Sequence, residues 1–531
     1  MTAPLESAAT AGFAGSRARF ETVLGWLESA EAGTLEHAEL EAHLQADARE
    51  LFRQLYQDHL DLRAEREPRI AAVADAEGVG HGSAEPGHTR GLATVFGPVQ
   101  VTRIAYRARG QANLHPADGG LNLPADRYSH GLRRLAAIEA ARGSFDGAVE
   151  AIERGTGQQV GKRQVEELAQ RSVADFDAFY SGRQPPAGST GDALVLSCDG
   201  KGVVMRPDAL RAATAAAAAK TSPKLATRLS KGEKRNRKRM AEVGTVYDAT
   251  PTPRTPADIL PATEEERREA AAGPVPANKW LMASVVEDAA SVVGRIFDEA
   301  ERRDPEHQRT WVALVDGNNH QIDRIGAEAR ARKVSVSVVI DLIHVLEYLW
   351  KAAWCFHAEG DPAAAAWVRH HASAVLDGKS TRVAGAIRRA ATMAELDRAK
   401  RAGADACATY LTNKSRYLDY PTALTKGWPI ATGVIEGACR HLVKDRMDLT
   451  GARWGLSGAE AILRLRALRS NSDFEDFWRY HLTTSPGNAT ASTSPATPAT
   501  SFRTRREAPP VEPHPSEIPH TGVLRHMITA A

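Results

Sequence analysis

The sequence predicts an α/β protein in which a mixed β-sheet carries an all-helical insertion and follows a mainly helical N-terminal region with a β-hairpin. Three observations lead to this fold class. Helical periodicity dominates residues 16–66 and 129–180, short apolar β-rich runs alternate with helix-prone segments from 193 to 341, and residues 342 to about 410 return to a helical pattern. A chain of 531 residues is also too long for one ordinary core, so we expect several structural units.

Changes in composition place the boundaries between these units. The linker at 181–191 is rich in Gly, Pro and Ser, and the C-terminal tail is rich in Ser, Thr and Pro but poor in aromatic residues, which predicts disorder. We therefore expect a helical N-terminal region (1–90), a hairpin and helix-turn-helix-like domain (91–182), a sheet domain in two pieces (190–345 and 426–480), a helical insertion (346–425) and a disordered tail (483–531).

The N-terminal half begins with helical patterning around Phe20, Leu24 and Leu27. A Gly/His-rich break at 78–91 follows, and then two β-rich arms flank the turn pair Gly97-Pro98, which predicts a β-hairpin at about 92–107. Two helices with a Gly-containing turn between them come next, and the second begins near Gly161. This spacing suits a helix-turn-helix with Lys162 and Arg163 at the start of its recognition helix, and it suits an ordinary pair of packed helices equally well.

Five apolar runs predict the strands of the sheet: one that ends at Asp199, and others at 242–248, 279–285, 311–316 and 334–341. Helix-prone segments at 286–304 and 321–332 separate the later strands. The alternation of strands and helices in this part of the chain predicts a mixed sheet. Trp350, Trp354 and Trp367 are the expected core anchors of the helices that follow.

Three acidic residues stand in apolar settings. Asp199 and Asp316 each end a short apolar run and precede Gly, while Glu436 opens a basic helical segment. A carboxylate at the inner end of a buried strand is costly unless it is paired, hydrogen-bonded or metal-bound. Taken singly, each acid reads as a turn or cap residue. Taken together, the three acids indicate a site that binds divalent metal.

Composition narrows the class of protein. Lys and Arg number 68 against 66 Asp and Glu, so any nucleic-acid surface must come from local clustering. The four cysteines are far apart and form no CxxC pair, which argues against a zinc ribbon and a secreted disulfide framework. No apolar run approaches 18 residues, and the N-terminus lacks the apolar core of a signal peptide. We expect a soluble, cytoplasmic protein without a membrane partner.

Three phrases carry a resemblance to a known family. They are CDGKGVVMR at 198–206, LSKGEKRNRKRM at 229–240 and ATGVIEGACRHLVKDRMDLTGARWG at 431–455. With two strand-borne aspartates, a helical insertion and then a helix-borne glutamate, the chain resembles the ISKra4 family of bacterial insertion-sequence transposases, which are of the DDE type. The resemblance runs from about residue 92 to Trp478.

The resemblance implies an RNase H-like core that cleaves DNA strands and transfers them. Two Mg²⁺ (or Mn²⁺) ions would be held by Asp199 as the bridging carboxylate, by Asp316 on one ion and by Glu436 on the other, because hard oxygen ligands suit these metals. The implied partner is double-stranded DNA, both the terminal inverted repeats of the element and the target. The implied assembly is a homodimer or larger, and the implied location is the bacterial cytoplasm at the nucleoid.

Asp341 and His344 also acquire a meaning from the resemblance. Related DDE families carry a Cys/Asp-x-x-His signature after the fifth strand, and DLIH at 341–344 fits it. A His one turn into a helix is as often a buried or capping residue, and both interpretations stand. The chain departs from the pattern in one respect, since its N-terminal half has no Cys-rich zinc motif. Recognition of the DNA ends would then rest on the hairpin and helices.

Basic clusters provide the expected DNA surface. One set lies within nine positions, a second recurs along the Glu436 helix with Arg440 and Lys444 on the Glu436 face, and a third follows a Thr-Gly turn. In order they are Lys231, Lys234, Arg235, Arg237, Lys238 and Arg239; Arg440, Lys444 and Arg446; and Arg453 and Trp454. The first set also reads as a solvated loop, and Trp454 also reads as a core anchor.

Two other functions fit the same sequence. One is a DNA-binding protein, a repressor or architectural factor, whose core has lost catalysis. The other is an RNase H-like nuclease that cuts DNA without joining it. The presence of all three acids favours the transposase.

Overall fold

The computed structural model describes residues 12–186, 188–220, 233, 237–358, 360–449 and 451–484. Lys231, Lys234, Arg235 and the predicted tail from residue 485 lie outside these ranges. The described chain forms two compact units. Residues up to Ser181 and those from Ser472 onward make the first unit, and Gly182–Asn471 make the second. Within the described ranges, no helix is both long enough and apolar enough to cross a membrane.

The first unit begins with two long helices, α2 (Ala14–Leu27) and α3 (His37–Glu65), joined through η1 (Ala32–Thr34). The backbone N–H and the hydroxyl of Ser16 donate to Asp58 Oδ2 at 2.8 and 2.6 Å, and the rings of Trp26 and His43 stack at 3.7 Å. The helix α3 starts with a capping box formed by Glu36 and Glu39, which satisfies backbone donors at its N-terminus. These contacts pair α2 with α3.

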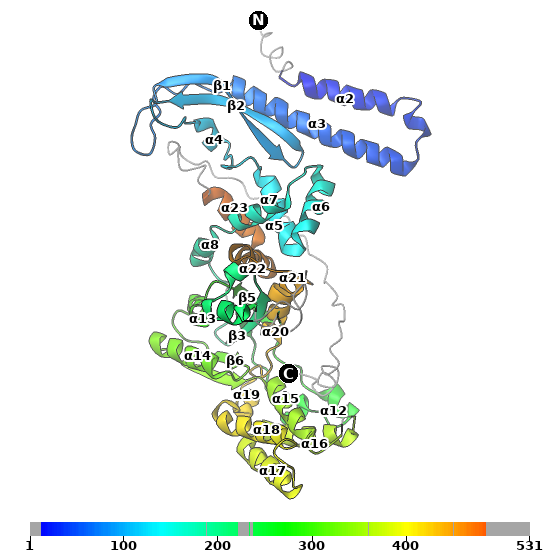
Figure 1. The fold of residues 1–531 in the computed structure, drawn as a ribbon, viewed down its shortest axis with the longest axis vertical. Helices are drawn as coiled ribbons and strands as arrows, with labels where there is room; N and C mark the ends of the chain where they lie inside the picture. Colours follow the sequence, from blue (N-terminus) through cyan, green and yellow to red (C-terminus); the bar gives the residue numbers. More distant parts are fainter. Residues whose placement is uncertain are drawn as a thin grey trace. The chain divides into compact units, whose positions relative to one another are not determined.

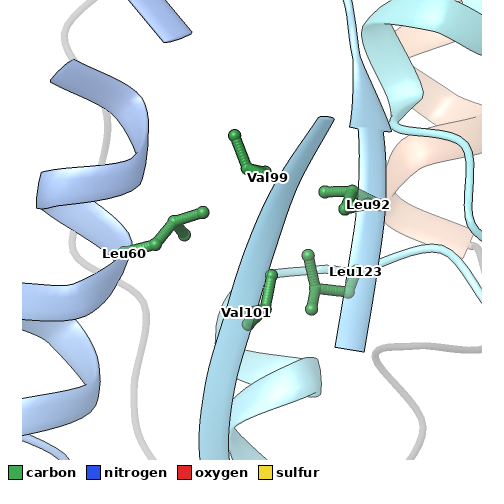
Figure 2. Close-up of a cluster of buried hydrophobic side chains, with 5 residues drawn as sticks. All are labelled: Leu60, Leu92, Val99, Val101 and Leu123. Atoms are coloured by element: carbon green, nitrogen blue, oxygen red, sulfur yellow. The ribbon is translucent and has the colours of Figure 1, made fainter. Parts of the chain in front are cut away.

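A long β-hairpin packs on the other side of α3. Strands β1 (Ser83–Thr94) and β2 (Gly97–Arg107) pair in antiparallel register. Leu60 of α3 points toward Val99 and Val101 of β2, with Leu92 and Leu123 completing a small apolar cluster (Figure 2). All five side chains are at most 7% exposed, so this cluster anchors the hairpin to the helix.

The hairpin is longer than the sequence predicted, and its turn lies elsewhere. The first arm starts at Ser83 because residues 83–91, which read as a Gly/His-rich break, pair with β2. The loop is Val95-Phe96. Gly97, which has a φ of 140°, is the first residue of β2 and pairs with Thr94. The prediction of a Gly97-Pro98 turn was therefore wrong.

Small helices complete the first unit: α4 (Pro116–Gly120), α5 (His130–Arg142), α6 (Phe145–Thr156), α7 (Lys162–Arg171), α8 (Phe176–Gly182) and, from the far end of the chain, α23 (Phe474–Thr484). The Tyr180 hydroxyl donates to Asp473 at 2.9 Å, and Phe179 meets Phe477 edge-on at 5.5 Å. The sheet domain was predicted to extend to residue 480, but the chain leaves that unit after Asn471 because the aromatic face of α23 packs on α8.

The second unit contains a five-stranded sheet with the order β5-β4-β3-β6-β7. Its strands are β3 (Ala193–Val204), β4 (Lys238–Ala249), β5 (Pro276–Ser284), β6 (Trp311–Val315) and β7 (Val336–Ile340). Strand β4 pairs antiparallel with both β3 and β5, while β6 and β7 run parallel to β3. The prediction of a mixed α/β sheet is confirmed.

Helices connect the strands and extend the unit. Between β3 and β5 lie η2 (Pro207–Ala209), α9 (Ala212–Ala219), α11 (Pro256–Ile259) and α12 (Glu264–Glu269), and α13 (Ala289–Arg303) and α14 (Asn319–Arg332) join β5, β6 and β7. The insertion is α15 (Leu342–Ala353), α16 (Pro362–Leu376), α17 (Ser380–Met393), α18 (Ala402–Asn413), η3 (Ser415–Tyr417) and α19 (Tyr420–Thr425) (Figure 1).

The chain then returns to the sheet. It forms α20 (Gly433–Ala438), a π-helical segment η4 (Cys439–Lys444), α21 (Asp445–Met447) and α22 (Leu456–Ser470). Next to α22, Asn471 exchanges two hydrogen bonds with the backbone of Leu281 in β5, at 2.8 and 3.0 Å. These bonds hold the C-terminal helices against the edge of the sheet.

Candidate active site

Asp199, Asp316 and Asp341 occupy one level across three neighbouring parallel strands. The pair Leu196 and Ala313 fixes the register between β3 and β6 at 313 − 196 = 117 residues, which equals 316 − 199. Val315 pairs with Ile340 in β7, an offset of 25, which equals 341 − 316. The Asp341 N–H donates to Val315 O at 2.8 Å and continues this ladder. Neighbouring strands are about 4.8 Å apart, so continuing this register past the last paired residues places the three acidic residues in a row, here called the carboxylate row.

The local backbone orients the first two acids. Asp199 Oδ1 accepts a hydrogen bond from the Gly200 N–H at 2.7 Å, and Asp316 Oδ1 accepts one from the Asn318 N–H at 2.8 Å. Gly317 has a φ of 93°, a conformation open to glycine, and this allows the sharp turn after β6. Both acids are half-buried. The sequence predicted Asp199 at the end of its strand. Asp199 lies within β3 instead, because β4 pairs with the whole segment as far as Val204.

The pKa of the Cys198 thiol reflects the negative charge of the neighbouring acids. Burial raises its pKa to about 12, and the negative charges of Asp316 and Asp199 add to the shift. A buried thiol disfavours its charged form, and nearby carboxylates disfavour it further. Negative charge is therefore concentrated around Cys198, from Asp199 in β3 and Asp316 after β6.

The helix α20 brings Glu436 to the same region. Cys439, one turn beyond Glu436, places its Sγ 3.2 Å from Asp199 Oδ2, and Thr432, one turn before it, donates to Asp341 Oδ2 at 2.5 Å. Thr432 Oγ1 also lies 3.5 Å from Glu436 Oε1. Burial of the carboxyl raises the pKa of Glu436, and the charge of Asp341 raises it further. Glu436 as a residue is exposed to solvent, and its carboxyl group lies close enough to protein for partial burial to raise its pKa.

Asp341 and His344 form a coupled pair at the start of α15. Asp341 is fully buried and caps the helix by accepting the Ile343 N–H at 2.9 Å. Its other oxygen lies 3.0 Å from His344 Nδ1, and this hydrogen bond raises the pKa of His344 to about 9. His344 is thus an imidazolium at neutral pH. Asp341, rather than His344, is thus the capping residue of α15, and a role of the pair near DNA stays a prediction.

The acids suit a hard divalent cation by type. Carboxylate oxygens are the ligands that Mg²⁺ and Mn²⁺ prefer. Within the described ranges, no group of three or more His, Cys, Asp or Glu side chains is arranged to hold a metal ion. The backbone brings Asp199 and Asp316 to one level and α20 brings Glu436 near Asp341, while the two-ion site stays a prediction.

The basic residues of the second unit divide into exposed and buried groups. Arg440, Lys444, Arg453 and Lys238 are exposed, and Arg237 is half-buried. Arg239 Nε donates to Val285 O at 2.5 Å. Lys238 and Arg239 belong to β4 rather than to a solvated loop, because the strand begins four residues earlier than predicted.

Arg446 and Trp454 do not lie where a DNA contact would require. Arg446 is 3% exposed and Trp454 is 5% exposed, and the guanidinium lies over the indole ring at 4.6 Å from its centre. Trp454 Nε1 donates to Met447 O at 3.1 Å. Burial lowers the pKa of Arg446 to about 10. Burial of both side chains argues against DNA contact and supports the interpretation of Trp454 as a core residue.

In the first unit, Lys162 and Arg163 lie at the start of α7 and are exposed. Lys162 pairs with Asp146 at 2.7 Å and Arg163 pairs with Glu167 at 3.1 Å. Gly157, in the left-handed conformation, ends α6 before the turn to α7. The two helices form the predicted pair, and both the helix-turn-helix and the packed-pair interpretations stand.

Sequence reasoning missed Thr432 and Cys439. Their only signal is their spacing of four residues before and three residues after Glu436, which places all three on one side of a helix. A search of known family models gives no match for this chain, and a search of curated proteins gives none.

Proposed function

We propose that this chain is a DDE-type DNA transposase of an insertion sequence similar to the ISKra4 family, with an RNase H-like core. The observation that carries the proposal is the shared register of Asp199 and Asp316 on neighbouring parallel strands, with α20 bringing Glu436 beside the same row. The mixed five-stranded sheet and the helical insertion before Glu436 add support.

In this proposal Asp199, Asp316 and Glu436 would hold two Mg²⁺ or Mn²⁺ ions, with Asp199 as the carboxylate common to both and Asp316 and Glu436 as the ligands of one ion each. When bound, such ions activate a water or a 3′-hydroxyl and stabilise the leaving 3′-oxygen. The chain's own residues then orient and bind. Arg440 and Lys444, exposed on the segment that follows Glu436, attract the phosphate backbone. The positive charge that His344 carries at neutral pH offsets part of the negative charge around Glu436.

The proposed partners are the terminal repeats of the element and a target duplex, bound by a dimer or larger assembly at the bacterial nucleoid. Synapsis of two DNA ends requires at least two copies. Lys162 and Arg163 in α7, together with the basic residues near β4, are the proposed contacts to DNA.

A donor plasmid that carries the reading frame with its native flanking DNA tests the proposal. With Mg²⁺, the purified protein should cut at the element boundaries and join the new 3′ ends to a target plasmid. Asp316→Asn should reduce cutting by about 1000-fold or more while DNA binding in a gel-shift assay persists. Asp377→Asn, an exposed acid at the end of α16, is the matched control and should cut like the unmutated chain.

Two other outcomes separate the alternatives. Cutting without joining, also on branched DNA, would identify a nuclease. Specific binding to the flanking DNA with no cutting at any Mg²⁺ or Mn²⁺ concentration would identify a DNA-binding protein without catalysis. Either outcome contradicts the proposal.

A further inference from the structure

The helical insertion reaches back to the turn that carries Asp316. The Tyr410 hydroxyl, on α18, donates to the backbone carbonyl of Asp316 at 3.1 Å. Lys414, one helical turn further along, donates from Nζ to Asn319 Oδ1. Tyr410 and Lys414 thus form hydrogen bonds with the two ends of the short segment from Asp316 to Asn319.

Several details show that this contact is tightly packed. Lys414 is 8% exposed, and a buried ammonium is costly without a partner. Burial lowers the pKa of Lys414, while the charges of Asp316 and Asp323 act in the opposite direction. At Gly317, a Cβ atom would lie 2.7 Å from the Tyr410 hydroxyl, so no larger residue fits without movement. The Tyr410 ring stacks on Tyr348 of α15 at 4.0 Å, which fixes its direction.

A second tyrosine from the insertion does the same at the next strand. The Tyr420 hydroxyl, in α19, donates to the carbonyl of Ile340 at 2.9 Å, and Ile340 immediately precedes Asp341. Tyr420 is fully buried. Hydroxyls from the insertion therefore bind the backbone at the ends of both β6 and β7, next to two members of the carboxylate row.

We propose that Tyr410 and Lys414 are positioning residues, through which the helical insertion fixes the Asp316 turn in the conformation that the active site requires. The role in activity rests on the proposed function, whereas the role in ordering the turn does not. Neither residue contacts DNA or the reacting atoms in this proposal. Their effect passes through the backbone carbonyl of Asp316 and the side chain of Asn319.

Hydrogen exchange measured by mass spectrometry on the full chain tests the ordering directly. In Tyr410→Phe, which keeps the ring and its stacking, peptides that cover residues 314–320 should exchange about 2- to 10-fold faster, because one buried hydrogen bond is removed. Lys414→Met should act in the same direction. Tyr417→Phe and Lys400→Met make the same chemical changes elsewhere in the insertion, at a hydroxyl paired with Arg416 and at an exposed ammonium, and should leave these peptides unchanged.

Activity supplies the second readout. Tyr410→Phe should raise the Mn²⁺ concentration needed for half-maximal strand cutting by about 3- to 10-fold, with DNA affinity unchanged, because a less ordered Asp316 binds the cation more weakly. Unchanged exchange at 314–320 in both variants overturns the inference. A cation requirement equal to that of Tyr417→Phe also overturns it. If the unmutated chain cuts no DNA while exchange rises as expected, the ordering role stands and the proposed function fails.

Discussion

Asp199 and Asp316 lie side by side at one level of two parallel strands, because the 117 residues between them equal the register offset of β3 and β6. Asp341 extends the same level to β7 through an offset of 25 residues. Like charges on neighbouring strands repel one another, and a bound cation or the loss of one charge removes that repulsion. We therefore expect the row to destabilise the protein without a cation and to favour cation binding.

Neutralising one acid should therefore have opposite effects with and without cation. In EDTA, we expect Asp316→Asn to unfold at a slightly higher temperature than the unmutated chain, by about 1–2 °C. Adding Mn²⁺ at about ten times its dissociation constant should stabilise the unmutated chain by roughly 1.4 kcal/mol, or about 3–5 °C, and should leave Asp316→Asn unchanged. Thermal unfolding followed by circular dichroism measures both. Asp377→Asn should respond like the unmutated chain, and a full Mn²⁺ response in Asp316→Asn would contradict the assigned ligand.

The exposed and buried basic residues near Glu436 should differ in their effect on DNA binding. Removing one side chain that neutralises a DNA phosphate reduces the slope of log K against log salt by about 0.9. Arg440→Gln combined with Lys444→Gln should reduce the slope by about 2, measured by fluorescence anisotropy with the DNA that flanks the reading frame. Arg446→Met should leave the slope unchanged while it lowers the unfolding temperature, because Arg446 packs over Trp454 in the core. A reduced slope in Arg446→Met would restore the sequence-based interpretation.

Much of the second unit follows from local patterns. Apolar β-rich runs are strong signals when both faces of a strand are buried, as in β6, where every residue is buried. The same patterns place Asp199 on a strand and Asp316 at the end of one, and the structure has Asp199 within β3 and Asp316 directly after β6. They leave the pairing open, since the spacing of 117 residues acquires meaning only when the partners Leu196 and Ala313 are known.

Other features depend on contacts between distant segments. The first arm of the hairpin contains Gly87 and Gly91, which weaken a strand signal, and it becomes a strand because β2 pairs with it. The turn of Arg446 into the core follows a π-helical segment at Cys439–Lys444, whose wider turns break the period of an α-helix. The hydrogen bond from the Tyr410 hydroxyl to the Asp316 carbonyl joins residues 94 positions apart, so no local sequence pattern predicts it.

The pairing of His344 with Asp341 should make stability depend on pH. The folded-state pKa of His344 is raised from 6.5 to about 9, so its contribution is complete below pH 6.5 and is lost as the pH rises through about 9. Since the side chain is 33% exposed, we expect the contribution to be about 1–2 kcal/mol. The stability gap between the unmutated chain and His344→Gln should therefore be largest near pH 6 and should narrow by pH 9.5, measured by urea unfolding. His370→Gln is the control, and a gap that is constant across this range would show that the charge of His344 contributes nothing.

Two glycines of the second unit should respond in opposite directions to the same change. Gly427 has a φ of 71°, and a Cβ atom there would lie 2.2 Å from the backbone nitrogen of Thr252, whose N–H donates to Gly427 O at 3.0 Å. Gly427→Ala must strain the backbone and move the segment at Thr252, so we expect a loss of about 2–4 kcal/mol. Gly294 lies inside α13, and a Cβ atom there would lie 4.0 Å from the nearest atom of another element, Glu328 Oε1. Gly294→Ala should therefore raise the free energy of unfolding by about 0.5–1 kcal/mol, because it reduces the entropy lost on helix formation. Thermal unfolding of both variants beside the unmutated chain decides the matter, because a Gly427→Ala protein that unfolds at or above the unmutated temperature would mean that these two backbone segments do not meet.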